Sequence, residues 1–356
     1  MEDTRSAVFV SSGYGNALLL IPLLKTLKKR GHQLTGVFTS PFESEPFFEN
    51  SGLFEELVPV RNGSLAALFA ISRYLEFEYI YLDRLAATRK NILLAHFIGK
   101  FIITAHVPHT LPGFLKRKLF LVPPQEGLHD AQQILGLVDA ENARKPLNLE
   151  DMRLPRLFNT KKTASLSKPY IAVQLSAGSG AASFKNWPTE HWISLLKELA
   201  LVFPSLHFVL LGESGELDAA ETVMQANIPN VQSEVGKTSL HELVSILDEC
   251  LLFIGPDSAL MHLAAVSAKP TFTLWGATDF SVFGYATIDP AMHEVVYQDI
   301  ACRPCSVWIK PNVSRFKNAE SCPDHRCMKE LPLAAVLPRC IAFIEKQISN
   351  TLRHVQ

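Results

Sequence analysis

The segment Gln174–Gly180 is built from small residues, which suits a binding site for an anionic group. Ser176, Gly178 and their neighbours would let backbone N–H groups approach an oxyanion closely. Lys185 follows and offers the positive charge that a diphosphate requires. The alternative interpretation is an ordinary loop with a solvated lysine.

A second candidate is Glu216, in the segment Gly212–Glu216 that follows a predicted strand. An acid at the carboxyl end of a parallel strand can accept both hydroxyls of a ribose. An acid in the first turn of a helix can instead be stabilised by the helix dipole. The residue pattern by itself favours the dipole role.

The segment Gly255–Leu263 reads as a strand end, a Gly-Pro turn and the start of a helix. Asp257 is expected to be the N-cap of that helix, and its carboxylate could also hold sugar hydroxyls. The first free N–H groups, near Ser258 and Ala259, would form an anion site. His262 lies in an apolar stretch and is expected to be a hydrogen-bonded core histidine.

The first loop, Ser11–Ala17, resembles a dinucleotide fingerprint because it contains Gly13 and Gly15. Leu18 occupies the third glycine position, however, and no acid ends the second predicted strand, so a nicotinamide site is not expected. The loop is either a tight turn that opens a helix or a segment close to a reacting group.

Four cysteines and one histidine near the C-terminus have the spacing of a tetrahedral zinc site. Free thiols and a local disulfide are the alternatives. The cysteines are Cys302, Cys305, Cys322 and Cys327. Structural zinc is therefore one hypothesis, and no other cofactor is expected.

The segment Leu111–Phe120 interleaves basic and aromatic residues. Such a segment could contact an anionic membrane surface or a phosphorylated lipid, although a solvated loop is the commoner outcome.

These segments sit in an alternation of short apolar strands and helical-period stretches, which indicates an α/β fold with parallel sheets. The expected strands are 7–11, 34–39, 57–60, 79–82, 101–105, 170–175, 207–211, 251–254 and 271–274. The expected helices are 15–30, 64–74, 86–97, 125–137, 188–202, 216–225, 239–248, 257–265 and 333–346.

The segment 146–168 lacks this alternation of strands and helices and is rich in charged residues and proline, so we interpret it as a linker. It separates an N-terminal domain, 1–145, from a C-terminal domain, 169–332, and a final helical segment, 333–356. Lys and Arg number 34 against 35 Asp and Glu, so no global charge favours nucleic acid. No secretory signal or long apolar run is evident, so we expect a cytoplasmic protein.

The motifs together resemble glycosyltransferase family 9, the ADP-heptose:lipopolysaccharide heptosyltransferases. Lys185–Trp192 is similar to the family's K-x-W-P-x-E-H-W, and Gly236–Leu240 to its G-K-T-S-L. Asp257–Ala264 is similar to D-S-G-P-M-H-L-A, and Gly276–Asp279 to G-P-T-D. The resemblance implies the GT-B fold: two Rossmann-like, doubly wound parallel-sheet domains that face a central cleft.

The resemblance also implies roles. The donor would bind the C-terminal domain and the acceptor the N-terminal one. Donor-site residues would be Ser176, Gly178, Lys185 (diphosphate), Glu216 (ribose), Lys237 and Thr238 (adenine), Asp257 (heptose), Ser258 and Ala259 (phosphate) and His262. Acceptor-site residues would be Gly13, Gly15, Asn16 and Arg61, and the catalytic residues would be Asn16, Lys185 and Asp257.

Two positions depart from the family pattern. Asn16 stands where the family has its proposed general base, an Asp, and a neutral amide is a poor proton acceptor. Ala259 replaces a glycine, which narrows the pocket by one methyl group.

The resemblance predicts inverting transfer of a heptose or related sugar from an ADP-sugar to a lipopolysaccharide-core or related glycan acceptor, without a required metal. Peripheral contact with the inner face of the inner membrane would fit such an acceptor. A non-catalytic nucleotide-sugar-binding or assembly protein is the alternative, because of Asn16. A sugar-nucleotide epimerase of the same fold is a third reading.

Overall fold

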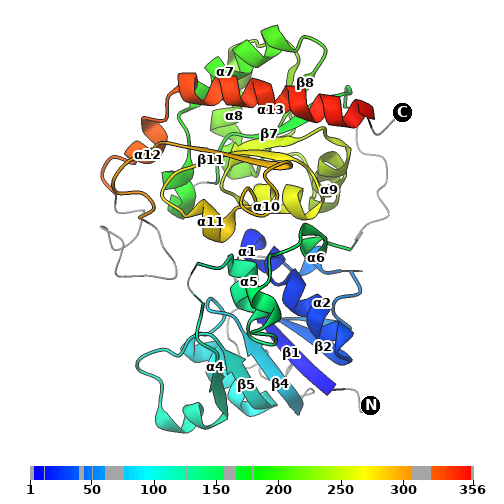
Figure 1. Ribbon diagram of the computed structural model, residues 1–356, viewed down its shortest axis with the longest axis vertical. Coiled ribbons are helices and arrows are strands. Elements are labelled where there is room, and N and C mark those ends of the chain that lie inside the picture. The colour runs from blue at the N-terminus through cyan, green and yellow to red at the C-terminus, as the bar shows by residue number, and fades with distance from the viewer. Residues whose placement is uncertain are drawn as a thin grey trace. The chain divides into compact units, whose positions relative to one another are not determined.

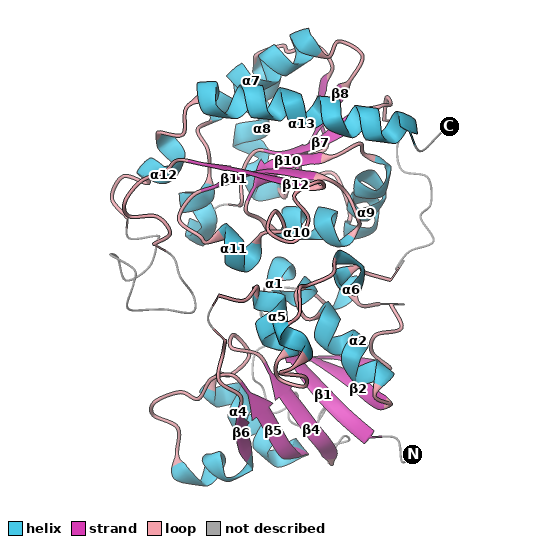
Figure 2. Ribbon diagram, in the orientation of Figure 1, coloured by secondary structure: helices cyan, strands magenta, loops and turns pink. Residues whose placement is uncertain are grey.

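The computed structural model describes residues 4–11, 13–39, 44–49, 51–60, 76–125, 127–155, 166–178, 180–305 and 322–353. The chain forms two compact units, Met1–Asn159 and Thr160–Gln356. Each unit is built around one six-stranded parallel sheet (Figures 1 and 2). The predicted helix 64–74 and the candidate Arg61 lie outside the described residues.

The sheet of the first unit has the strand order β3-β2-β1-β4-β5-β6, the Rossmann order. Its strands are β1 (Thr4–Val10), β2 (His32–Phe38), β3 (Glu56–Pro59), β4 (Phe77–Leu82), β5 (Gly99–Thr104) and β6 (Leu119–Leu121). Residues 7–10 of β1 are all buried, as expected for a central parallel strand that is covered on both faces. In β1 and β4, Phe9 is paired with Leu82, so the loops that follow these two strands leave the sheet at the same edge.

The single helix predicted at 15–30 is wrong, because the segment folds as two helices, α1 (Tyr14–Leu18) and α2 (Ile21–Lys29). Pro22 lies in the first turn of α2. Proline has no N–H and clashes with the carbonyl four residues earlier, so it is accepted at a helix start and not in the interior.

The other helices of the first unit are α4 (Arg89–Ile98), α5 (Asp130–Leu135) and α6 (Leu149–Met152). Short 3-10 helices are η1 (Glu45–Phe47), η2 (Gly113–Lys118) and η3 (Asn142–Arg144). The segment 111–120, expected as a loop, thus contains η2 and the start of the edge strand β6.

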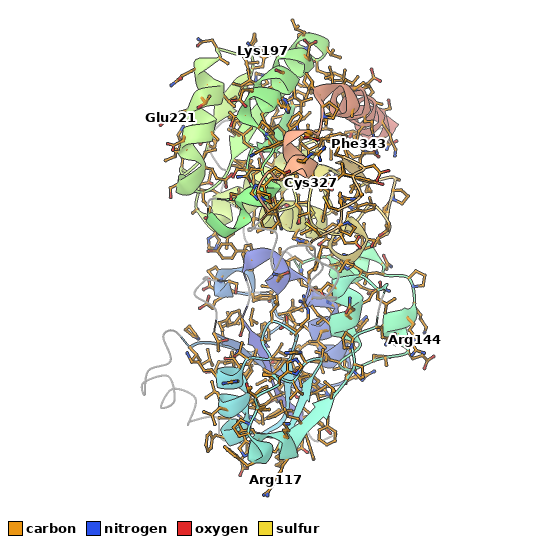
Figure 3. All side chains as sticks on the ribbon, turned by 90° about the vertical axis from the view of Figure 1, so that its left-hand side faces the viewer. Arg117, Arg144, Lys197, Glu221, Cys327 and Phe343 are labelled. Atoms are coloured by element: carbon orange, nitrogen blue, oxygen red, sulfur yellow. The ribbon has the colours of Figure 1, made fainter. Side chains whose placement is uncertain are left out.

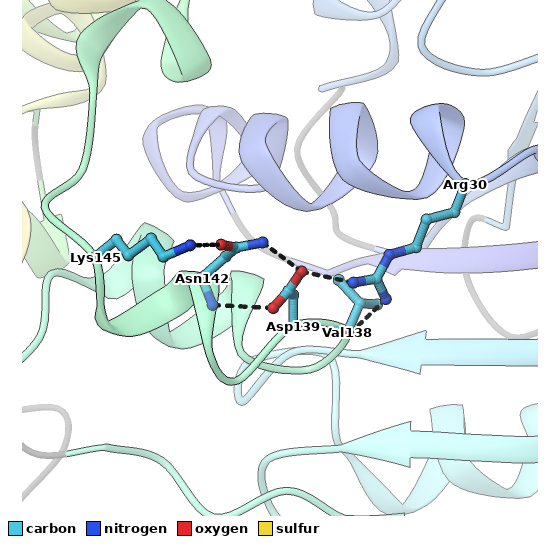
Figure 4. A network of polar contacts seen from close by, with 5 residues as sticks. All are labelled: Arg30, Val138, Asp139, Asn142 and Lys145. Atoms are coloured by element: carbon cyan, nitrogen blue, oxygen red, sulfur yellow. Dashed lines mark hydrogen bonds and ion pairs between the residues drawn. The ribbon is translucent and has the colours of Figure 1, made fainter.

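A polar network joins the end of α2 to the chain that follows α5 (Figure 4). Arg30 donates to the carbonyl of Val138 and to Oδ2 of Asp139, at 2.6 Å in each case. Asn142 donates to both carboxylate oxygens of Asp139, and Lys145 donates to Asn142. These contacts hold the segment after α5 against α2.

The second unit repeats the same topology, with the order β12-β11-β10-β7-β8-β9. Its strands are β7 (Tyr170–Gln174), β8 (His207–Leu211), β9 (Val231–Ser233), β10 (Phe253–Pro256), β11 (Thr271–Trp275) and β12 (His293–Tyr297). The edge strands β9 and β12 were not predicted. Figure 1 shows α7, α8 and α13 on one side of this sheet and α9, α10 and α11 on the other.

The helices of the second unit are α7 (Thr189–Val202), α8 (Leu217–Gln225), α9 (Leu240–Glu249), α10 (Ala259–Val266), α11 (Phe280–Phe283), α12 (Arg326–Lys329) and α13 (Leu333–Arg353). Two further 3-10 helices are η4 (Gly180–Lys185) and η5 (Ser214–Glu216). Trp192 of α7 is fully buried in the core under α7 and α13. Within the described residues, no helix has the length and apolar character needed to span a membrane.

Candidate functional site

The candidate site of the second unit lies where the strand order reverses, between the neighbouring strands β7 and β10. Gln174 ends β7, and Asp257 and Ser258 directly follow β10. Ligands of doubly wound sheets bind beyond the carboxyl ends of the strands at such a switch point. The sheet therefore brings the 174–185, 212–216 and 257–262 segments to one edge.

Gln174 connects two of the predicted donor-site residues. Its Oε1 accepts a hydrogen bond from the hydroxyl of Ser258 at 2.6 Å, and its Nε2 donates to Oε1 of Glu216 at 3.2 Å. All three side chains are buried. The sequence interpretation did not single out Gln174, because a glutamine at the end of an apolar strand carries no local signal.

Glu216 lies in the first turn of η5, as the local pattern favoured, and its carboxylate is buried. Burial raises its pKa from 4.5 to about 7, against the hydrogen bonds from the Glu213 backbone N–H and from Gln174. Gly212 makes room for it, since a Cβ there would lie 2.8 Å from the carboxylate carbon. A carboxylate in such a position can accept hydroxyl groups but is poorly solvated when empty.

Asp257 does not cap α10, so that prediction is wrong. Strand β10 runs to Pro256, the helix begins at Ala259, and Ser258 is the N-cap, accepting a hydrogen bond from the Met261 N–H at 3.2 Å. Oδ2 of Asp257 instead lies 2.8 Å from Nζ of Lys185.

The hydroxyl of Thr278 donates to the same Asp257 oxygen at 2.6 Å. Burial would raise the pKa of Asp257, but the charge of Lys185 and the hydrogen bonds from Lys185 and Thr278 hold it below its ordinary value. Asp257 is therefore an ionised carboxylate that orients an ammonium group beside the N-terminus of α10.

His262 lies on the buried side of α10, and its Nδ1 is 2.8 Å from the hydroxyl of Tyr285. Burial lowers the pKa of His262 to about 4 and raises that of Tyr285. The imidazole is thus neutral at pH 7 and has the partner expected of a core histidine.

The small-residue loop after β7 is held by Asn186. Its Oδ1 accepts the Ala177 N–H at 2.8 Å, and its Nδ2 donates to the carbonyl of Gly178 at 3.3 Å. The Gly178 N–H donates to the hydroxyl of Ser176 at 3.0 Å. Gly178 has a φ of +107°, which favours glycine.

Lys237 and Thr238 lie on the loop between β9 and α9. The N–H of the preceding Gly236 donates to the carbonyl of Gly212 at 3.0 Å, so this loop adjoins the Glu216 loop. Nζ of Lys237 donates to the carbonyl of Ser233. The structure thus places the predicted adenine residues beside the predicted ribose residue.

In the first unit, Gly13 is the N-cap of α1, Gly15 is buried, and Asn16 is half-buried in the same helix. Near this loop, Asn91 of α4 donates to Oγ of Ser11 at 2.7 Å and to the carbonyl of Ala86 at 2.9 Å. Asn91 therefore joins the ends of β1 and β4 at the sheet edge.

Two buried carboxylates at the same edge were not singled out from the sequence. Asp83 directly follows β4, as Asp257 follows β10, the strand at the equivalent place in the second sheet. Burial raises its pKa to about 6, with Asp130 adding to the effect. Oδ1 of Asp83 accepts the Ala86 N–H at 2.6 Å, and both carboxylates line a cavity of about 20 Å³.

The four clustered cysteines line another cavity of about 20 Å³, which Arg303, Asp324 and His325 also reach. Nε2 of His325 and Nη2 of Arg303 are buried there and have no hydrogen-bond partner among the described residues. Across the described part of the chain, no three or more His, Cys, Asp or Glu side chains are arranged to hold a metal ion. Figure 3 marks Cys327 at this place.

Two curated proteins are similar in sequence to part of this chain. The lipooligosaccharide heptosyltransferase 2 of Campylobacter jejuni is 26% identical over 195 residues, which is 52% of this chain and 54% of that protein. The lipopolysaccharide heptosyltransferase 3 of Escherichia coli is 50% identical over 189 residues, 48% of this chain and 51% of that protein. The chain therefore spans about half the length of these curated relatives.

Two solved structures share the whole fold. The Escherichia coli ADP-heptose lipopolysaccharide heptosyltransferase II has a TM-score of 0.70 at 17% identity and covers 96% of this chain and 99% of its own. Escherichia coli heptosyltransferase WaaC with ADP has a TM-score of 0.64 at 17% identity and covers the same shares. Residues 112–312, more than half of the chain, match glycosyltransferase family 9 (heptosyltransferase). The chain belongs to this family and has the GT-B fold.

Proposed function

We propose that this protein is an inverting glycosyltransferase that moves a heptose or related sugar from an ADP-sugar to a lipopolysaccharide-core or related glycan acceptor. The observation that carries the proposal is one sheet edge that joins Glu216, Gln174, Ser258, Asp257 and Lys185 through hydrogen bonds and an ion pair. At such an edge, Glu216 could bind the ribose, Ser258 and Lys185 the diphosphate, and Asp257 the sugar of one donor molecule.

The diphosphate would lie against the N-terminus of α10, where the amides of Ser258 and Ala259 face an anion favourably. Lys185 would add one positive charge. When the bond between the sugar and the diphosphate breaks, these groups would stabilise the charge that develops on the leaving ADP. This arrangement makes a metal ion unnecessary for leaving-group stabilisation.

The ribose would hydrogen-bond to Glu216 in its ionised form. The adenine would lie by the loop of Lys237 and Thr238, which adjoins the Glu216 loop. The choice of ADP is supported by the structural likeness to WaaC with ADP and by the family match. The glycan acceptor is inferred from the relatives, which are heptosyltransferases of lipopolysaccharide and lipooligosaccharide.

The acceptor hydroxyl would attack the anomeric carbon from the side opposite the diphosphate and must lose its proton. Asn16 cannot take that proton, so another group is required. Asp83 is the candidate that we propose, because it follows the strand next to β1 and its pKa of about 6 leaves it ionised at pH 7.

Donor turnover by the full chain tests the proposal. ADP-heptose would be supplied with lipopolysaccharide acceptor, and release of ADP would be followed for the parent and for Lys185→Ala. We expect the Lys185→Ala protein to lose at least tenfold in turnover. Lys197→Ala, on the exposed side of α7 and labelled in Figure 3, is the matched control. Parent-like turnover by Lys185→Ala would refute the phosphate role.

The non-catalytic alternative makes a different prediction from the same assay. If the protein only binds nucleotide sugars, the parent will bind ADP-heptose without turning it over, and Asn16→Asp alone will be active. Turnover by the parent excludes that alternative. Product analysis without acceptor tests the epimerase alternative, because an epimerase would convert the sugar nucleotide with no acceptor present.

We also propose that the four clustered cysteines hold a structural zinc ion. The proposal is supported by their shared cavity and by Nε2 of His325, which is buried and has no partner among the residues that the structure describes. Zinc binding would require the four sulfur atoms to surround a single metal position. Sets of thiolate ligands of this kind also bind iron. Elemental analysis and chelation of the purified, reduced protein provide the test. One equivalent of zinc and a lower unfolding temperature after chelation are expected, and a metal-free protein of unchanged stability contradicts the proposal.

A further inference from the structure

The first unit has one strongly basic stretch of chain. Residues 84–125 contain seven Lys and Arg and no Asp or Glu, although the whole chain has a net charge of −1. This stretch forms α4, β5, η2 and β6. The cations are Arg84, Arg89, Lys90, Lys100, Lys116, Arg117 and Lys118.

The same stretch exposes large apolar side chains. Of the eleven large apolar residues that are exposed in the described part of the chain, six belong to it. They are Leu93, Phe97, Phe101, Phe114, Phe120 and Leu121. Such clustering is unusual for a solvated surface, where exposed apolar residues are scattered singly.

Three of these side chains form a defined surface, which we name the α4–η2 face. It consists of Leu93 and Phe97 of α4 and Phe114 of η2, of which Phe97 is 62% and Phe114 52% exposed. The ring of His96 bridges the two phenylalanines, with centroid distances of 5.9 Å to each.

The α4–η2 face is held in place from beneath. Nζ of Lys118 donates to the carbonyls of His96 and Gly99, at 2.7 and 2.8 Å, which fixes η2 to the end of α4. Leu115 of η2 is buried in the core of the first unit. The exposed phenylalanines are therefore presented by anchored backbone and not by a loose loop.

Exposed cations flank these apolar side chains. Lys90 precedes Leu93 by one helical turn, and Lys116 and Arg117 follow Phe114 in η2, with Arg117 labelled in Figure 3. Of the more distant cations, Lys100 is neutralised by Glu78 at 2.9 Å. Among the residues that the structure describes, no carboxylate pairs with Lys90, Lys116 or Arg117, so the face combines apolar rings with exposed positive charge.

We propose that the α4–η2 face docks the protein onto a bilayer that contains anionic lipids. Phe97 and Phe114 would enter the interface between headgroups and acyl chains, and Lys90, Lys116 and Arg117 would lie among the anionic headgroups. Stable attachment to a membrane surface generally takes two such signals together. A nucleic acid or an acidic protein would match the charge but would leave Leu93 and Phe97 without an apolar environment.

The inference stands on this surface alone and does not require that the protein transfer a sugar. It would complement the proposed function, because a glycolipid acceptor lies at a bilayer. Vesicle binding measured without donor or acceptor therefore separates failure of this inference from failure of the proposed activity.

The experiment is co-sedimentation of the full chain with vesicles of phosphatidylcholine, with and without phosphatidylglycerol. We expect binding only with the anionic lipid and weaker binding at high salt. Phe97→Ser with Phe114→Ser should weaken binding at least tenfold. Lys116→Gln with Arg117→Gln should weaken it roughly fivefold for each charge removed.

The matched control comes from α7 of the second unit, which exposes Leu201 at 76% beside the exposed Lys197. Leu201→Ser and Lys197→Gln should bind vesicles as the parent does. All variants change exposed side chains, and their unfolding temperatures should match that of the parent.

Three outcomes would overturn the inference. The first is a parent that binds no anionic vesicles, and the second is binding that the α4–η2 variants leave unchanged. The third is a parent that dimerises in sedimentation velocity and becomes monomeric in the Phe97 and Phe114 variants without vesicle binding, since the face would then join two copies of the chain.

Discussion

Nζ of Lys185 lies 2.8 Å from Oδ2 of Asp257, although the two residues belong to different loops of the second sheet. The aspartate side chain is 5% exposed and the lysine side chain 21% exposed. The carboxylate therefore holds the ammonium group at the entrance of the site, with the N-terminus of α10 beside it. We therefore expect changes to this ion pair to alter both the stability of the protein and its binding of the donor.

We expect Lys185→Met to destabilise the protein, because it leaves the Asp257 carboxylate buried without its counter-charge. The loss in the free energy of unfolding should be roughly 2–3 kcal/mol, less than for a fully buried pair because solvent reaches Lys185. Urea unfolding measures it. Adding Asp257→Asn should recover part of the loss, and purely additive effects of the two changes would argue against the coupling.

Binding of ADP should depend on pH through Glu216. Its pKa of about 7 means that the protonated form, which cannot accept both ribose hydroxyls, accumulates as the pH falls below 7. The dissociation constant of ADP should then rise, by at most tenfold per pH unit. Calorimetry between pH 5 and 8 provides the measurement.

Glu216→Gln is the control for that pH dependence, because the phosphates of ADP also titrate in this range. The variant should bind ADP more weakly at pH 8 and should keep only the pH dependence that ADP itself contributes. Glu221→Gln, at an exposed position of α8 labelled in Figure 3, should behave as the parent. An unchanged pH dependence in Glu216→Gln would remove Glu216 from the ribose site.

The same carboxylate predicts a change of stability with pH in the ligand-free protein. The pKa of Glu216 is raised on folding, from 4.5 to about 7, so the folded state binds more protons than the unfolded state between these values. The contribution to stability is full below pH 4.5 and is lost as the pH rises through 7, on the order of 3 kcal/mol. Glu216→Gln should therefore be more stable than the parent at pH 8, and equal stabilities in thermal unfolding would contradict this.

Gln174→Leu should weaken ADP binding without touching the ligand. The change removes the partner of the Ser258 hydroxyl and one donor to Glu216, and both groups are buried. Unpaired buried groups of this kind cost about 1–3 kcal/mol each in stability, and a loosened Glu216 should bind ADP roughly tenfold more weakly. Gln225→Leu, at an exposed position of α8, should leave both measurements unchanged.

Asp83→Asn distinguishes a proton acceptor from a turn cap. The amide oxygen of Asn can still accept the Ala86 N–H, so the fold should be kept, but the amide cannot take a proton. Turnover should fall at least a hundredfold. In the parent, kcat/KM should decline as the pH falls below about 6, where Asp83 becomes protonated. Parent-like turnover by Asp83→Asn would assign Asp83 to the turn alone.

Much of the architecture followed from local pattern, because the periodicity of buried residues is a property of the chain itself. The central strands β1, β7 and β8 were predicted with small boundary errors, since they are buried on both faces and read as continuous apolar runs. The edge strands β6, β9 and β12 were missed. Strands β6 and β9 span only three residues each and have no fully buried positions, so they carry no such signal.

The candidate site divides in a similar way. Lys185, Glu216 and Asp257 were identified from residue type and position after a strand. The contacts that join the site were not, because Gln174 is 42 residues from Glu216 and 84 residues from Ser258, and it meets both only where the sheet places β7 between β8 and β10. Likewise, Asp257 was predicted to be the N-cap of the helix, but β10 extends to Pro256 and the N-cap of α10 is Ser258. The sequence by itself determined which groups could do chemistry, and the tertiary structure decided which of them face one another, because strand order and burial depend on the whole sheet and not on neighbouring residues.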